Sequence, residues 1–146
     1  MPKSTTFAND LVALIFNATA IADLAENDTS APLTSLYVAL HATEPGIGGS
    51  QLTGETAYDN YLRVAVNRNS GGSGWSVSGG VAQNQAVIPF ATCGAGGGTV
   101  AFVSIGTDVK PNAGKVLWKG AVSPSLSVTT GIQPQFAINA LTCTET

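Results

Sequence analysis

The sequence is short of charged residues, and the basic ones form no cluster. Only 10% of its 146 residues are Asp, Glu, Lys or Arg, whereas a typical soluble domain carries about 25%. The formal net charge is −3, and the six Lys and Arg residues are scattered apart from the pair Arg63 and Arg68. A protein that binds nucleic acid needs a basic face to displace the counterions of the phosphates. We therefore expect no nucleic-acid partner and a neutral, polar surface that suits packing against other proteins.

Long apolar runs are also absent. No stretch approaches the roughly 20 apolar residues that cross a bilayer. The stretch 11–16 is too short for the core of a signal peptide, and Asp10 directly precedes it. We therefore expect no membrane partner and no export signal, in a protein made in a cytoplasm.

Histidine and cysteine, which carry much of protein chemistry, are scarce. His41 is the only histidine, and Cys93 and Cys143 are the only cysteines. Cys93 as a nucleophile with His41 as its base is conceivable, but nothing in their local sequence supports it. A cytoplasm keeps thiols reduced, so two buried free thiols are the favoured interpretation, and a disulfide between neighbouring strands is the alternative.

Carboxylates gather only in turns and in one long loop. Glu44, Glu55 and Asp59 lie in or beside that loop, where two of them could act as the acid and base of a glycosidase. The more ordinary interpretation is that these three carboxylates are solvated side chains of the loop. The glycine-rich run 94–98 precedes a strand and lacks the Lys-Ser/Thr pair of a phosphate loop, so it indicates a turn.

The remaining candidates for ligand binding are equally weak. Asp23, Glu26 and Asp28 share a turn, but they lack the alternating spacing and the glycine of a known calcium loop. Trp75 and Trp118 can stack on a sugar, although an aromatic residue on a short strand more often fills a core. The sequence therefore predicts no enzyme, no cofactor and no metal site.

One helix is predicted, near the start of the chain. Ser4 or Thr5 can cap it, and its apolar residues follow at helical spacing. These residues are Phe7, Leu11, Leu14 and Ile15. The apolar face can extend to Leu24 after a kink near Asn17, and Pro32 marks the break that follows.

After Pro32 the hydrophobic period changes to two, which predicts strands. Leu36, Val38 and Leu40 alternate with less apolar neighbours. In the next strand Leu62, Val64 and Val66 share one face. About eight short strands are expected, at residues 36–41, 61–67, 75–78, 81–90, 99–105, 115–122, 125–129 and 133–141. Such spacing favours a mainly β fold, a single antiparallel β-sandwich of jelly-roll strand count.

The expected division of the chain is a helical segment at 1–30 and a β-sandwich domain at 31–146. The connection at 43–59 is rich in Gly, Ser and Thr and is long for a plain link between strands. Long loops on a rigid scaffold often carry function, so we expect a binding or contact loop here.

Several motifs resemble a known family. They are LYVALHATEPG at 36–46, YLRVAV at 61–66, GWSVSG at 74–79, AVIPF at 86–90 and FVSIGT at 102–107. The chain resembles small virion proteins of tailed phages and prophages, which are often labelled phage tail fibre protein. The likeness runs from the helix around Phe7 to the strand around Phe136. The resemblance implies a component of the virion, similar to the jelly-roll proteins that cement some phage capsids.

The resemblance implies two alternative functions. The favoured one is a capsid decoration (cement) protein that bridges capsomers on the capsid surface, with the major capsid protein as its partner. Such a protein is expected to be a symmetric dimer or trimer, because many modest contacts add up on a repeating lattice. The alternative is a tail or tail-fibre component that contacts a host receptor or glycan. In both cases the protein is made in the cytoplasm of the bacterial host.

The interface residues expected from the sequence are apolar or aromatic. They are Phe7, Leu11, Leu14, Ile15, Tyr37, Tyr58 and Tyr61. The helix either caps the open end of the sandwich or reaches out as an arm to a neighbouring subunit. The tyrosines are expected to be exposed, either in a subunit interface or in a patch that binds a glycan.

Overall fold

The computed structural model describes residues 4–21, 24–25 and 32–145. The chain forms two compact units that alternate along the sequence. The first unit comprises Met1–Ser35, Val66–Ile88 and Phe136–Thr146, and the second comprises Leu36–Ala65 and Pro89–Gln135. The expected division into a helical segment at 1–30 and a β-sandwich domain at 31–146 stays a prediction.

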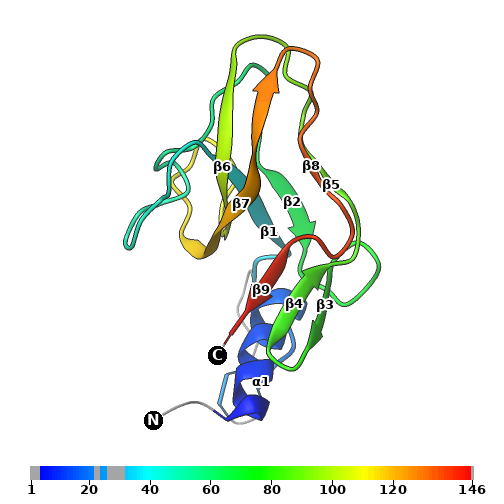
Figure 1. Cartoon of the computed structure of the whole chain (residues 1–146). Helices are drawn as coiled ribbons and strands as arrows, with labels where there is room; N and C mark the ends of the chain where they lie inside the picture. The colour runs from blue at the N-terminus through cyan, green and yellow to red at the C-terminus, as the bar shows by residue number, and fades with distance from the viewer. Residues whose placement is uncertain (1–3, 22–23, 26–31, 146) are drawn as a thin grey trace. The chain divides into compact units, whose positions relative to one another are not determined.

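Strands dominate the described residues (Figure 1). The elements are α1 (Thr5–Asn17), β1 (Ser35–His41), β2 (Val64–Asn67), β3 (Trp75–Ser78), β4 (Val81–Asn84), β5 (Ile88–Pro89), β6 (Gly97–Gly106), β7 (Val116–Thr129), β8 (Gln135–Phe136) and β9 (Thr142–Thr144). The sheets have the orders β2-β1-β6-β7, β3-β4-β9 and β5-β8. This confirms the predicted class, a mainly β protein of antiparallel sheets with one N-terminal helix, whereas the jelly-roll resemblance is not confirmed.

The strand boundaries differ from those expected. The predicted strand 81–90 divides into β4 and β5 because the Asn84 side chain replaces the backbone ladder there. Its Nδ2 donates to Ala86 O at 2.7 Å and to Ala137 O at 2.8 Å, and its Oδ1 accepts from Leu141 N–H at 2.9 Å. The two strands predicted at 115–122 and 125–129 form the single strand β7, and β9 was not predicted.

The helix begins where the sequence indicates and ends earlier than its longest predicted extent. The Ser4 hydroxyl accepts from Phe7 N–H at 3.2 Å, and Ala18 ends the helix in the left-handed region at φ 54°. The guanidinium of Arg68 donates to Ile15 O at 2.6 Å and to Leu14 O at 2.7 Å, which satisfies carbonyls of the last turn. The expected continuation of the helix after a kink is therefore wrong. No helix among the described residues is long and apolar enough to cross a membrane.

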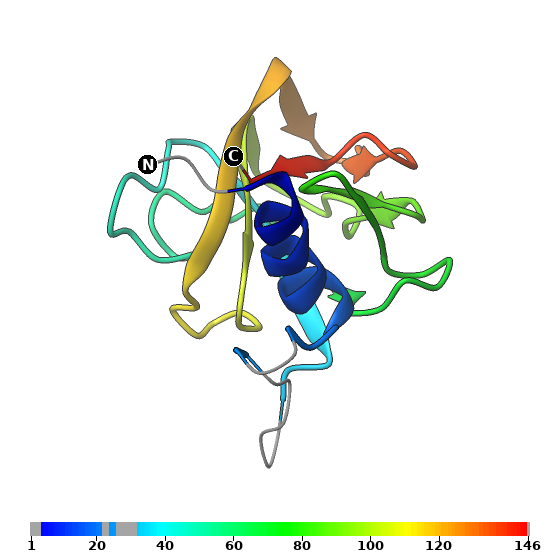
Figure 2. The ribbon, with the colours of Figure 1, turned by 90° about the horizontal axis from the view of Figure 1, so that it is seen from below.

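The first unit places α1 against β3 and β4 (Figure 2). The helix buries Ala8, Val12 and Phe16, and the Phe16 ring meets the Trp75 ring edge-on with centroids 4.7 Å apart. Trp75 is fully buried, as its predicted core position requires. The helix is thus a packed element of its own unit, and the choice between a cap on the sandwich and an arm stays a prediction. The apolar residues expected to form its inner face, Phe7, Leu11, Leu14 and Ile15, are only half-buried and flank that face.

The second unit is built on the antiparallel pairing of β1 with β6, in which Leu40 lies opposite Val103 and His41 opposite Phe102. Leu36, Val38 and Leu40 are buried, as predicted. His41 is buried as well, so the end of β1 has no solvent-facing side. The loop that follows β1 starts at the surface, because Ala42, Thr43 and Glu44 are exposed.

Both cysteines are free and buried, as favoured from the sequence. Cys93 Sγ lies 3.4 Å from Ala95 O. Burial raises the pKa of the Cys143 thiol to about 12, which keeps it in the unreactive protonated form.

Candidate functional site

The long loop at 43–59 is tied to the strands and turns around it by its backbone. Ala42 N–H donates to Gly54 O at 2.8 Å, and Thr56 N–H donates to Leu40 O at 2.9 Å, so the loop closes on the end of β1. Gln51 N–H donates to Gly114 O at 3.1 Å. Loops usually satisfy their backbone with water, so these bonds show a loop built into the fold.

A buried ion pair stands at the base of this loop. Arg63 Nε donates to Glu55 Oε1 at 2.8 Å, and Arg63 Nη2 donates to Glu55 Oε2 at 2.9 Å. The Arg63 and Glu55 side chains are 0% and 3% exposed. This two-pronged geometry gives the strongest form of the Arg–carboxylate contact. We call it the loop clamp.

The loop clamp also reaches a second segment of the chain. Arg63 Nη1 donates to Asp108 O and to Asn112 O, both at 2.9 Å. The turn that joins β6 to β7 is thereby fixed to the loop base. A buried charge is costly unless its hydrogen-bonding groups have partners, and here each of the three guanidinium nitrogens donates at least once.

Tyr61 joins the clamp to the core. Its hydroxyl donates to Glu55 Oε1 at 3.0 Å and accepts from Leu40 N–H at 2.9 Å. Its ring stacks on Phe90 with centroids 6.2 Å apart, and Lys110 Nζ lies 4.4 Å from the ring centroid. Burial raises the pKa of Tyr61 well above its usual range, so the phenol stays protonated and keeps its donor.

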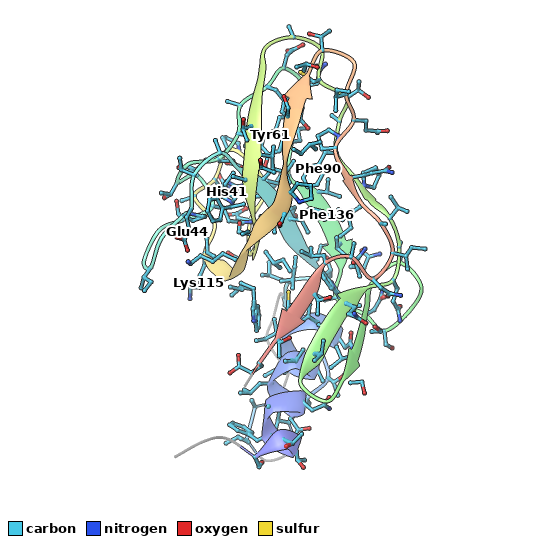
Figure 3. All side chains as sticks on the ribbon, viewed as in Figure 1. His41, Glu44, Tyr61, Phe90, Lys115 and Phe136 are labelled. Atoms are coloured by element: carbon cyan, nitrogen blue, oxygen red, sulfur yellow. The ribbon has the colours of Figure 1, made fainter. Side chains whose placement is uncertain are left out.

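Two neutral side chains complete the support of the loop. His41 lies between the loop and β6 (Figure 3): Nδ1 is 3.0 Å from Thr53 O, and Nε2 is 2.8 Å from Ser104 Oγ. A carbonyl oxygen can only accept, so Nδ1 carries the proton and Nε2 accepts from the serine. Gln51 Nε2 donates to Tyr37 O at 2.9 Å. Burial lowers the pKa of His41, which favours this neutral form.

The tip of the loop is apolar and faces solvent. Ile47 is fully exposed, between Gly46 at φ 75° and Gly48 at φ 81°. A Cβ on Gly49 would lie 1.8 Å from Pro45 O, so the tip closes too tightly for any other residue. The tip therefore presents one large apolar side chain on a fixed base.

The structure places the predicted interface residues unevenly. Tyr58 and Tyr61 lie together in the second unit with ring centroids 5.2 Å apart, but they are 3% and 5% exposed. The expectation that they are exposed is wrong, because their rings fill the core beneath the loop. Tyr37 is half-buried. The helix residues belong to the first unit, and the interface assignment of the whole set stays a prediction.

The candidate reactive pairs are not formed. Both ring nitrogens of His41 are engaged by Thr53 and Ser104, so neither serves Cys93 as a base. Glu44 is exposed and paired with Lys119, whereas Glu55 is held by Arg63, so the three loop carboxylates do not share one environment. Only for Glu55 is the expectation of a solvated carboxylate wrong.

Groups of side chains that could bind a metal ion are also absent from the described residues. Within residues 4–21, 24–25 and 32–145, no group of three or more His, Cys, Asp or Glu side chains could hold a metal ion. Asp23, Glu26 and Asp28, the weak calcium candidates, lie outside the described residues.

Sequence reasoning missed the clamp because it placed Leu62 inward at the start of the strand. Of Leu62, Val64 and Val66, which were expected to face the core, Val66 is buried, but Leu62 is 59% exposed and its neighbour Arg63 is buried. The alternation of Tyr61 and Arg63 could have indicated that both face the core. That prediction requires a buried carboxylate as the partner of the arginine.

Comparison with known proteins gives one family. Residues 2–144 match the family described as "Podophage GP4 fiber I protein gp80", which is almost the whole chain. No curated protein matches the chain.

We predict that removal of the clamp arginine destabilises the fold. Arg63→Met should lower the free energy of unfolding by about 3–5 kcal/mol, because Glu55 is left as a buried, unpaired charge. Lys119→Met, which breaks the exposed pair with Glu44, should cost less than about 1 kcal/mol. Urea denaturation measures both variants, and equal losses would contradict the buried clamp.

We also predict a pH dependence that stems from the only histidine. Because burial lowers the folded-state pKa of His41, the unfolded chain binds the proton first as the pH falls below about 6.5. The contribution of His41 to stability is therefore complete above that pH and is lost as the pH falls toward the lower folded pKa, by at most about 1.4 kcal/mol per pH unit. His41→Gln should flatten the slope of unfolding free energy between neutral and mildly acidic pH. An unchanged slope would exclude His41 as its source.

Proposed function

The chain belongs to the podophage GP4 fiber I protein gp80 family and is a bacteriophage structural protein, and from this premise we propose that it is a non-enzymatic fibre component of the virion. The observation that carries the proposal is the family match over residues 2–144, whose description names a fiber protein. In this role the protein binds other proteins and transforms no substrate.

The geometry of the loop supports a binding role. The charged and polar groups of the loop base are bonded to one another inside the unit, so they offer little to a ligand. At its tip the loop presents Ile47, on a base held by the Glu55–Arg63 pair. A preorganised apolar anchor loses little conformational entropy on binding, which suits attachment to a matching hollow on another virion protein.

A capsid decoration protein is the second candidate. The low charge of the sequence favours it, because a neutral polar surface can be covered by capsid contacts without leaving charges unpaired. In that role the partner is the major capsid protein, and the site is the outer capsid surface. The two candidate functions differ in the expected number of copies per virion, since a capsid shell offers many more equivalent sites than a fibre.

The copy number per virion decides between the two candidates. Quantitative mass spectrometry of purified particles, referred to the major capsid protein, measures it. The fibre role predicts a small number set by the symmetry of the tail, and the decoration role predicts a simple lattice fraction of the capsid protein count. Absence of the chain from purified particles would overturn both.

The loop makes a further prediction about assembly. Ile47→Ser should leave the unfolding transition unchanged and reduce incorporation into particles about tenfold or more, because a buried isoleucine side chain contributes about 1.5–3 kcal/mol. Ile138→Ser is the matched control, since Ile138 is 56% exposed and lies in the first unit. Equal incorporation of both variants would rule out the loop tip as the attachment point.

A further inference from the structure

Gln51 is fully buried in the long loop, although the residues on either side of it are not. Gln51 is 0% exposed, whereas Leu52 is 43% exposed and Ser50 is half-buried. A buried amide is tolerated only where its donor and its acceptor both have partners. Gln51 Nε2 donates to Tyr37 O at 2.9 Å, and Oε1 accepts from Asp108 N–H at 3.4 Å. The side chain therefore joins the loop to β1 and to the turn between β6 and β7.

Two glycines leave room for the Gln51 side chain. A Cβ on Gly106 would lie 2.2 Å from Gln51 Cδ, and a Cβ on Gly114 would lie 2.5 Å from Gln51 Oε1. The φ of Gly106 is outside the left-handed region, so the close approach of Gln51 and of Lys115 O explains why this residue has no side chain. Gln51 N–H also donates to Gly114 O at 3.1 Å. The end of β6 and the turn after it are thus shaped to receive this one side chain.

Gln51 lies closer to the tip of the loop than the loop clamp does. Ile47 precedes Gln51 by four residues and the clamp carboxylate by eight. The two ends of the tip meet between them, because a Cβ on Gly49 would lie 1.8 Å from Pro45 O. A shift of Gln51 therefore displaces the base of the tip directly.

We propose that Gln51 is the positioning residue of the loop tip: it fixes the direction in which Ile47 projects, whereas the loop clamp holds the base of the loop. The proposal rests on the proposed function, because it gives Gln51 the task of preorganising Ile47 for its partner on the virion. Without the bonds of Gln51, the tip samples several directions, and binding must first order it. Attachment then weakens although the unit stays folded.

An apolar side chain of similar length in place of the amide tests the proposal. Gln51→Met removes both side-chain hydrogen bonds. In the natural chain, the NMR order parameters of the Ile47 and Gly48 amides should be close to the rigid-backbone value of about 0.85. In Gln51→Met they should fall below about 0.6 while the amides of β1 keep theirs. Incorporation into particles should fall about tenfold or more, since binding must then order the tip.

A buried amide of the first unit supplies the matched control. Asn84 donates to Ala86 O at 2.7 Å and to Ala137 O at 2.8 Å, and it accepts from Leu141 N–H at 2.9 Å. Asn84→Leu removes these bonds without touching the loop. Both variants should unfold at a lower urea concentration, but only Gln51→Met should loosen the tip. A tip that loosens equally in both would overturn the proposal, because general loss of stability would then be the cause.

The two measurements separate this proposal from the function on which it rests. Order parameters below about 0.6 at the tip of the natural chain would overturn the proposal without any variant. A tip that stays rigid in Gln51→Met would overturn it as well. A tip that loosens in Gln51→Met while incorporation is unchanged would support Gln51 as the positioning residue and overturn the attachment role of Ile47.

Discussion

The buried pair of Glu55 and Arg63 is the interaction on which the second unit depends. Two charges withdrawn from water are tolerable only where their remaining hydrogen-bonding groups are satisfied. Tyr61 and the carbonyls of Asp108 and Asn112 meet that requirement. The same requirement holds the loop and the β6–β7 turn in place, because displacing either one leaves a buried charge without its partners. The clamp thereby converts a long connection into a fixed part of the fold.

The polar contacts at the base of the loop and the exposed apolar residue at its tip are related. His41 and Gln51 fill the inner face of the loop with directional bonds, so the loop is held by its base and its tip needs no contact with the protein. Ile47 therefore stays exposed at the tip.

Local rules predict local features of this chain and fail where distant segments meet. The Ser4 cap, the alternation of Leu36 and Val38, and the burial of Trp75 all follow from neighbouring residues. The end of α1 follows only in part, because Arg68, more than fifty residues away, donates to carbonyls of its last turn. The burial of Tyr61 likewise depends on a carboxylate in the preceding loop. A tyrosine two residues before an arginine suggests an exposed strand face, unless the carboxylate that neutralises the arginine is known.

These bonds predict that the loop at 43–59 opens only together with the strands that it is bonded to. Native-state hydrogen exchange of the amides of Gln51 and Thr56, compared with those of β1, tests it most directly. The clamp predicts that both loop amides exchange as slowly as β1 and respond to denaturant in the same way. Fast exchange of the loop amides while β1 stays protected would mean that the loop opens independently of the clamp, which would contradict this account.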